Sequence, residues 1–212
     1  MSVLLLRLSG PMQAWGVQSR FGVRDTAREP SKSGVVGLLA AALGRPRDAN
    51  IIDLANLRMG VRVDREGTLL RDYHTAQNVY RAKSGIKPTE LSTRYYLSDA
   101  CFLVGLEGES ALLDTLQQAL RDPVWALFLG RRSFPPGDPI WLVDGLQPGA
   151  ALEKALTTYP WLKSEPRTFP LVRMVIEDRA GSEIRPDQPI SFAPRRYAPR
   201  RLINEYRNLQ ML

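Results

Sequence analysis

The order of apolar segments along the first part of the chain constrains its fold most. A short, continuous apolar run at residues 3–9 predicts a buried strand, because a turn-forming glycine and proline follow it. Residues 33–44 are apolar on nearly every side and predict a deeply packed helix. Apolar residues recur at every second position in 57–65 and in 102–106, and this period of two predicts two further strands.

A second helix and a last strand complete the pattern. Leu113, Leu116 and Leu120 have the i, i+3, i+7 spacing of an amphipathic helix at 110–121, and we expect a strand around 124–129. The order β-α-β-β-α-β is the ferredoxin-like plan, which RRM domains share. The sequence therefore predicts an α+β, ferredoxin-like fold, although this fold carries many unrelated functions.

Two parts of the chain lie outside this plan. Residues 72–96 fall between the two middle strands, combine tyrosines with cationic residues, and far exceed an ordinary hairpin loop. We expect them to form a projecting arm, and a surface loop is the alternative. The tail has strand-like runs at 140–143 and 171–176 and then becomes rich in arginine. Prolines near its end favour edge strands and turns.

The net charge favours a polyanionic partner. The chain has 29 basic and 22 acidic residues, a net charge of +7, and most of the basic residues are arginine. The guanidinium fork fits phosphates and base edges better than an ammonium does, so nucleic acid is the leading candidate.

Cys101 is the only cysteine, which excludes a disulfide framework and fits the cytoplasm. Arg7 interrupts the apolar N-terminal run too early for a secretory signal or a membrane span.

The segment between the first strand and the first helix has the features of an anion site. A glycine turn at residues 10–16 is followed by three arginines, and Pro30-Ser31-Lys32-Ser33-Gly34 opens the helix. A helix N-terminus offers free N–H groups and a partial positive charge, which suit a phosphate. The candidate ligands are Arg20, Arg24, Arg28, Ser31, Lys32 and Ser33. The alternative is a solvated loop before an ordinary capped helix.

A second candidate cluster, Arg71-Asp72-Tyr73-His74-Thr75, contains the only histidine of the chain. Histidine titrates near neutral pH and can act as a general acid or base. Metal-free RNA cleavage usually needs a second group that moves a proton or stabilises charge, and no strong partner is evident beyond Tyr73 and Arg71. We favour the alternative, a structural or base-stacking histidine.

A third candidate is the basic loop Leu129-Gly130-Arg131-Arg132-Ser133. Glycine lets a backbone approach a phosphate closely, and arginine can grip phosphate or stack on bases. A structural turn is the alternative. The sequence has no HExxH, Walker loop or GxSxG motif and no tight carboxylate cluster, so we expect neither a metal nor a cofactor.

Several motifs, taken in order, resemble those of one family. They are Gly10-Pro11-Met12-Gln13-Ala14-Trp15-Gly16, Pro30-Ser31-Lys32-Ser33-Gly34, Arg71-Asp72-Tyr73-His74-Thr75, Tyr95-Tyr96-Leu97-Ser98-Asp99-Ala100 and Leu129-Gly130-Arg131-Arg132-Ser133. The family is CasD, a RAMP-type subunit of the type I-E CRISPR surveillance complex called Cascade. The resemblance covers roughly the first 145 residues, and the tail is similar only in being basic and rich in strands.

This resemblance implies a non-catalytic RNA-binding subunit. It implies an RRM-like palm at residues 1–145, a thumb inserted at about 76–94, and a basic, β-rich extension at 146–212. Such a subunit caps the 5′ handle of the CRISPR RNA (crRNA), contacts a CasC-type backbone subunit and a CasA-type large subunit, and meets target DNA only through the complex. Neither a cofactor nor a membrane is implied.

The residues that we expect to contact RNA come from all three clusters. They are Gln13, Trp15, Arg20, Arg24, Arg28, Ser31, Lys32, Ser33, Arg71, Tyr73, His74, Gly130, Arg131 and Arg132, with Arg81, Lys83 and Lys87 on the thumb.

Two other functions stay open. Some relatives in another CRISPR subtype cut precursor RNA, so one alternative is a metal-independent endoribonuclease of CRISPR repeats that uses His74 and Tyr73. The other is a general RNA chaperone with no preference for the handle.

Overall fold

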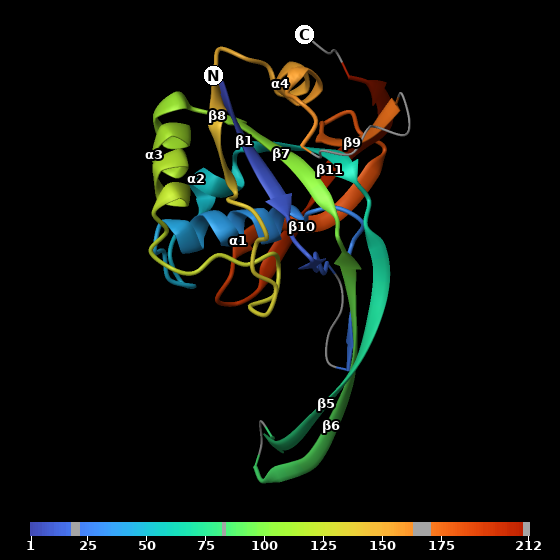
Figure 1. Cartoon of the computed structure of the whole chain (residues 1–212). Coiled ribbons are helices and arrows are strands. Elements are labelled where there is room, and N and C mark those ends of the chain that lie inside the picture. The colour runs from blue at the N-terminus through green and yellow to red at the C-terminus, as the bar shows by residue number, and fades with distance from the viewer. Residues whose placement is uncertain (18–21, 82–83, 163–170, 210–212) are drawn as a thin grey trace.

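The computed structural model describes residues 1–17, 22–81, 84–162 and 171–209. Its strands are β1 (Ser2–Ser9), β2 (Met12–Gln13), β3 (Val23–Arg24), β4 (Arg58–Arg65), β5 (Thr68–Tyr80), β6 (Ile86–Ser98), β7 (Cys101–Gly108), β8 (Trp141–Pro148), β9 (Leu171–Glu177), β10 (Glu183–Ser191) and β11 (Arg196–Asn208). The helices are α1 (Lys32–Ala42), α2 (Ile52–Ala55), α3 (Ser110–Arg121) and α4 (Leu152–Thr158). A seven-stranded sheet has the order β10-β11-β9-β4-β7-β1-β8, and β2, β3, β5 and β6 form a second sheet (Figure 1).

Strands β8, β1, β7 and β4 form one side of the large sheet. Each neighbouring pair is antiparallel, so β1 and β4 are parallel with β7 between them, and β7 and β8 are parallel with β1 between them. Helix α1 lies in the connection from β1 to β4, and α3 lies in the connection from β7 to β8. Both helices pack on one face, where Leu4, Leu6 and Leu8 of β1 share a core with Leu39 and Leu116.

The sequence patterns located five elements of the first 121 residues correctly, and the strand-like runs at 140–143 and 171–176 correspond to β8 and β9. The predicted strands at 3–9, 57–65 and 102–106 correspond to β1, β4 and β7, and the helices predicted at 33–44 and 110–121 correspond to α1 and α3. Continuous apolar runs and period-two alternation were reliable here because these strands are buried. The mixed α+β class is therefore correct.

The strand predicted around 124–129 is wrong. This segment is irregular, and the last strand of the group is β8, which begins at Trp141. The backbone N–H groups of Val124 and Trp125 donate instead to the carbonyls of Ala42 and Ala41, at 3.0 and 3.2 Å. The last carbonyls of a helix have no partner within it, so this apolar segment completes the C-terminus of α1 rather than pairing in the sheet.

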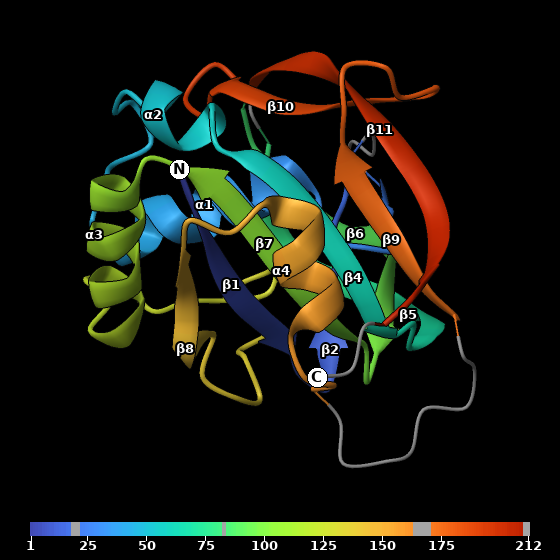
Figure 2. The same ribbon diagram turned by 90° about the horizontal axis from the view of Figure 1, so that it is seen from above.

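Helix α4 covers the other face of the large sheet (Figure 1, Figure 2). Its Leu152 and Leu156 are buried with Val3 and Leu5 of β1 in a second core. Glycines at 60 and 105 allow this close packing, because a Cβ at either position would come within 2.7 Å of a leucine of α4. RRM domains bind RNA on the sheet face opposite their helices. That face is closed here by α4.

A buried ion pair lies beneath the end of α4. The side chains of Arg62 and Asp64, both on β4, are 0% exposed and joined by two hydrogen bonds of 2.6 and 2.8 Å. The Arg62 guanidinium also donates to the carbonyls of Leu156, Tyr159 and Pro160. The pair therefore ties the chain that leaves α4 to the centre of the sheet.

The C-terminal strands extend the same large sheet. Strand β9 pairs with β4, and β11 pairs with both β9 and β10. The expected domain boundary at residue 145 falls within β8. Pro186 and Pro189 lie in β10, the outermost strand, where its register with β11 shifts twice. Proline is tolerated there because an edge strand does not need every N–H group for pairing.

A long hairpin projects from this body (Figure 1). Strands β5 and β6 pair antiparallel from Thr68 opposite Ser98 to Tyr80 opposite Ile86. Strands β2 and β3 pair with β6 near its base. The expected arm at 72–96 is therefore an extended two-stranded ribbon, and we call residues 68–98 the arm.

Candidate nucleic-acid interface

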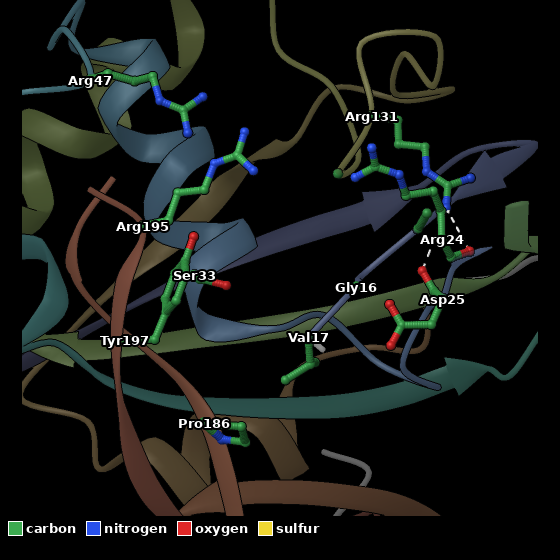
Figure 3. Close-up of a pocket in the computed structure, with 12 residues that line it drawn as sticks. Gly16, Val17, Arg24, Asp25, Ser33, Arg47, Arg131, Pro186, Arg195 and Tyr197 are labelled. Atoms are coloured by element: carbon green, nitrogen blue, oxygen red, sulfur yellow. Dashed lines mark hydrogen bonds between the residues drawn. The ribbon is translucent and has the colours of Figure 1, made fainter. Parts of the chain in front are cut away.

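Four arginines line one cavity beside the start of α1. Arg24 is on β3, Arg47 follows α1, Arg131 precedes β8, and Arg195 lies in the turn between β10 and β11. The cavity has a volume of about 780 Å³ and is open to solvent. Its other lining residues are Ala14, Gly16, Val17, Asp25, Ser33, Gly130, Pro186 and Tyr197. Segments far apart in the sequence thus meet in a cationic hollow, which we call the arginine cavity (Figure 3).

Arg131 is held in place while its charge is poorly compensated. Its Nη2 donates to the carbonyls of Arg24 and Asp25 at 3.3 and 3.5 Å. Burial first, and then the charges of Arg94 and Arg24, lower the pKa of Arg131. Asp25 and Asp72 act in the opposite direction but do not reverse the shift. A guanidinium in such surroundings is stabilised by any anion that enters the cavity.

The backbone at Gly130 fixes the loop that carries Arg131. Gly130 has φ of +85°, and a Cβ there would lie 1.8 Å from the carbonyl oxygen of Ala14. The N–H of Ala14 donates to the carbonyl of Leu129 at 3.1 Å, so the loop is docked against the glycine turn that follows β1. Only glycine fits this close approach in a left-handed conformation.

Replacing Gly130 by alanine is expected to lower stability and to displace Arg131. The left-handed backbone alone costs about 1–2 kcal/mol for a residue with a Cβ, and the clash with Ala14 adds to this cost. Gly149→Ala is the matched control, because Gly149 has φ of +69° but nothing within 4 Å of an added Cβ. Urea unfolding should show a clearly larger loss for Gly130→Ala, and equal losses would contradict the docked loop.

Gln13 and Trp15, which we expected to contact RNA, are buried instead. Gln13 Nε2 donates to the carbonyls of Leu8 and Ala100 at 3.2 and 2.8 Å, and its Oε1 accepts from Trp15 Nε1 at 3.2 Å. The Trp15 ring lies against Gly34 of α1, where an added Cβ would come within 2.8 Å of it. Both residues therefore hold the glycine turn against α1 and have no surface to offer a ligand.

The expected phosphate cradle at the start of α1 is already occupied by protein groups. The backbone N–H of Lys32 donates to Asp187 at 2.8 Å, and its ammonium pairs with Glu177 at 2.7 Å. Lys32 is only 1% exposed, and burial lowers its pKa although Glu177 opposes the shift. Ser31, also buried, accepts from the N–H of Gly34 at 3.3 Å. The prediction for Lys32 and Ser31 is therefore wrong, whereas half-buried Ser33 lines the arginine cavity.

Arg28 is exposed and lines a second hollow of about 480 Å³. Next to it, the buried carboxylate of Glu29 binds both Arg173 and Arg185 from the C-terminal strands. Arg173 also pairs with Glu66 at the base of the arm, at 2.7 Å. The loop that carries Arg24 and Arg28 is thus anchored to β9 and β10 through the Glu29 carboxylate, and Arg173 connects this anchor to Glu66 at the base of the arm.

The cluster at residues 71–75 does not form a common site. These residues lie on β5, and neighbouring side chains of a strand point to opposite faces, so Tyr73 and His74 face opposite sides of the arm. His74 Nδ1 lies 3.8 Å from Asp72, beyond hydrogen-bond distance, and both are exposed. Arg71 shares the face of Tyr73, which is 65% exposed. The arm therefore does not present Tyr73 and His74 together to one RNA bond.

The other residues predicted to bind RNA lie on exposed segments or outside the described residues. Arg132 is exposed and does not line the arginine cavity. On the arm, Arg81 is exposed, and Lys87 pairs with Glu90. Arg20 and Lys83 lie outside the described residues.

Sequence reasoning missed three cationic or aromatic residues of the cavity. Arg47, Arg195 and Tyr197 come from a loop and a strand far from the motifs. Arginine enrichment in the tail was the only signal for Arg195, and no local pattern distinguishes Arg47.

Over the described ranges, no group of three or more His, Cys, Asp or Glu side chains could hold a metal ion. Within the same ranges, no helix is long and apolar enough to cross a membrane.

Comparison with known proteins identifies a class and then a family. Residues 3–204 match the family described as CRISPR-associated protein (Cas_Cas5). This match spans nearly the whole chain, so the protein is CRISPR-associated and belongs to the Cas5 family.

Individual relatives agree with this assignment. The chain is 37% identical to the CRISPR system Cascade subunit CasD of Escherichia coli (strain K12) over 174 residues, which cover 74% of this chain and 77% of that protein. A solved structure described as a crystal structure of a Cas protein has 46% identity and a TM-score of 0.82, covering 98% of this chain and 96% of that one. A chain from a CRISPR RNA-guided surveillance complex has 34% identity and a TM-score of 0.80, covering 98% and 90%. The resemblance drawn from the motifs is confirmed.

Proposed function

We propose that this protein is a non-catalytic RNA-binding subunit of a Cascade-type CRISPR surveillance complex, acting in the cytoplasm. The arginine cavity would hold the sugar-phosphate backbone of the crRNA 5′ handle. One observation carries this proposal: four arginines from four segments line a solvent-open cavity that contains a single carboxylate among its described lining residues. Arginine forks bind phosphate through two hydrogen bonds at once, which fixes position as well as charge.

The shape of the protein supports single-stranded RNA as the ligand. The strand order β8-β1-β7-β4, with α1 and α3 on one face, supports the ferredoxin-like, RRM-like palm that the sequence predicts. The usual RNA-binding face of such a palm is covered by α4, which leaves the arginine cavity as the concave cationic surface. Proteins commonly bind unpaired strands through positive grooves with adjacent aromatic rings.

The arm supports assembly with other subunits. A two-stranded ribbon is marginally stable by itself, yet this one exposes the apolar side chains Leu69, Leu70, Tyr73, Tyr80, Ile86 and Leu91. Exposed apolar side chains of this kind mark interaction sites. We propose that the arm docks against the guide and a CasC-type backbone subunit, that a CasA-type large subunit contacts the body, and that target DNA is met only through the complex.

Parallel gels test the function against its nuclease alternative. Purified full-length protein would be incubated with a labelled CRISPR repeat RNA and, separately, with a mature handle RNA, and run on denaturing and native gels. We expect intact RNA and a shift that favours the handle. A discrete metal-independent cut in the repeat would overturn the proposal and favour an endoribonuclease, and His74→Ala and Tyr73→Phe would then be the next variants. Equal shifts with both RNAs would favour a general RNA chaperone.

Salt dependence should separate Arg131 from its neighbour. For single strands the slope of log K against log salt is about −0.7 per phosphate neutralised. Arg131→Gln should flatten the slope by about that amount, because Arg131 lines the cavity. Arg179→Gln is the control with the same charge change, since Arg179 is exposed and does not line the cavity. Identical slopes for the wild type and Arg131→Gln would remove Arg131 from the phosphate site, and Arg132→Gln tests the adjacent exposed residue in the same way.

A further inference from the structure

We propose that the wall of the arginine cavity formed by Tyr197 is a nucleobase subsite, on which one unpaired base of the bound RNA stacks. This inference rests on the proposed function and adds a defined position for a base. It divides the cavity into a phosphate side, with Arg24 and Arg131, and a base side, with Tyr197 (Figure 3).

Tyr197 has the exposure of a ligand-binding ring rather than of a core residue. It lies on β11 opposite Pro189 of the edge strand β10, and 42% of it is exposed although it lines a cavity. In the described part of the structure, no ring pair, cation–π contact or side-chain hydrogen bond involves Tyr197. Its ring is therefore open to a planar group that enters the cavity.

The residues around Tyr197 fit a nucleotide. Arg195 precedes it in the turn between β10 and β11, where a left-handed backbone with φ of +52° directs the chain back into β11. Arg47 lies on the same side of the cavity and donates to the carbonyl of Phe192 at 3.1 Å, which ties this turn to the segment after α1 (Figure 3). Both cations thus lie near the hydroxyl end of Tyr197, and Ser33 offers a hydroxyl beside the ring (Figure 3).

Arginines on two walls of a cavity that also contains an exposed ring suit a single strand better than a duplex. A base stacked on Tyr197 would place its sugar and phosphates between Arg47 and Arg195 beside the ring and the pair Arg24 and Arg131 across the cavity. Cavities of 300–1,000 Å³ enclose ligands of drug size, and a volume of about 780 Å³ falls in this range. Stacking tolerates any base, so Tyr197 should contribute affinity with little sequence preference.

The test measures the affinity of the full-length protein for fluorescent handle RNA. Loss of one stacked base costs about 1–3 kcal/mol, so Tyr197→Ala should weaken binding about 5- to 150-fold. Tyr197→Phe keeps the ring and should bind within a few-fold of the wild type. Tyr206→Ala is the matched control, because Tyr206 lies on the same strand, is 65% exposed and does not line the cavity. The salt slope of Tyr197→Ala should equal that of the wild type, since no phosphate contact is removed.

An abasic scan of the RNA then locates the base. Each handle position in turn would lose its base, and each RNA would be titrated against the wild type and Tyr197→Ala. At one position the two proteins should bind equally, because the stacking partner is already missing. The subsite would be overturned if Tyr197→Ala bound intact RNA as tightly as the wild type does. It would also be overturned if Tyr197→Ala bound more weakly than the wild type by the same factor at every abasic position. If only the subsite is wrong, Arg131→Gln should still weaken the binding of handle RNA. If the wild type does not bind handle RNA at all, the proposed function itself is refuted.

Discussion

Arg62→Met is expected to lower the free energy of unfolding by about 3–5 kcal/mol, the usual cost of removing one partner from a buried ion pair. Arg62 and Asp64 have side chains that are 0% exposed. Methionine would leave the Asp64 carboxylate without its cation, and three backbone carbonyls at the end of α4 would lose their donor. Urea unfolding followed by circular dichroism measures this loss.

Two further variants make this result specific. Arg45→Met breaks a surface pair with Asp53, whose side chains are 28% and 39% exposed, and should cost no more than about 1 kcal/mol. The double variant Arg62→Met, Asp64→Leu removes both charges and should recover part of the stability lost in Arg62→Met. An Arg62→Met loss as small as that of Arg45→Met would show that the buried pair does not hold the end of α4 on the sheet.

Replacing both Arg24 and Arg131 by glutamine is expected to weaken handle RNA binding about 100-fold in low salt. A hydrogen bond to a charged group contributes about 1.5–3 kcal/mol, and neighbouring contacts do not add fully, so a loss of about 3 kcal/mol follows for the pair. The chain should remain folded, because Arg24 pairs with Arg94 of β6 through its backbone, and Arg131→Gln removes only two long hydrogen bonds, of 3.3 and 3.5 Å. Fluorescence anisotropy with labelled RNA gives the affinity.

The comparison variant for this pair must carry the same change in charge at another place. Arg179→Gln combined with Arg121→Gln serves, since neither arginine lines the arginine cavity. If these two pairs weakened binding equally, net charge rather than the cavity would govern affinity. Long-range attraction of this kind is screened by salt, so repeating the comparison at physiological ionic strength sharpens the difference.

Much of the fold could be predicted because the burial of its central strands and helices produces simple apolar patterns in the sequence. The runs in β1 and β7 and the leucine spacing in α3 each follow from a single period. The segment around Val124 failed because its apolar residues resemble those of a strand, whereas its N–H groups are needed at the end of α1. Helix α4 is only seven residues long, and its role depends on glycines 60 and 105 in distant strands.

The site was predictable only in part, for a related reason. Arg24, Ser33, Gly130 and Arg131 belong to the clusters predicted from the sequence, and all of them line the cavity. The burial and pairing of Lys32 could not be predicted from the residues near it in sequence, because its partners Glu177 and Asp187 lie more than 140 residues away. Gln13 and Trp15 carry polar and aromatic groups that suit RNA equally well, and only their contacts with Ala100 and with α1 show that they are structural.

Tyr197 and Arg47 were missed because they reach the cavity through tertiary structure alone. Tyr197 enters it because β11 returns beside β10 at the edge of the sheet, and Arg47 because the chain turns back after α1. Arg47 has no neighbour in sequence that indicates a site, and the arginines beside Tyr197 do not show that its ring enters a cavity. Residues that a sheet edge brings together in this way need a three-dimensional structure to be found.

Photocrosslinking tests most directly whether RNA lies in the arginine cavity. Full-length protein would be bound to handle RNA carrying 4-thiouridine at successive positions and irradiated, and the crosslinked peptides would be identified by mass spectrometry. We expect crosslinks to the cavity segments that contain Arg24, Gly130 to Arg131, and Arg195 to Tyr197. Crosslinks confined to α4 and the sheet face beneath it, with none from these segments, would contradict the central claim.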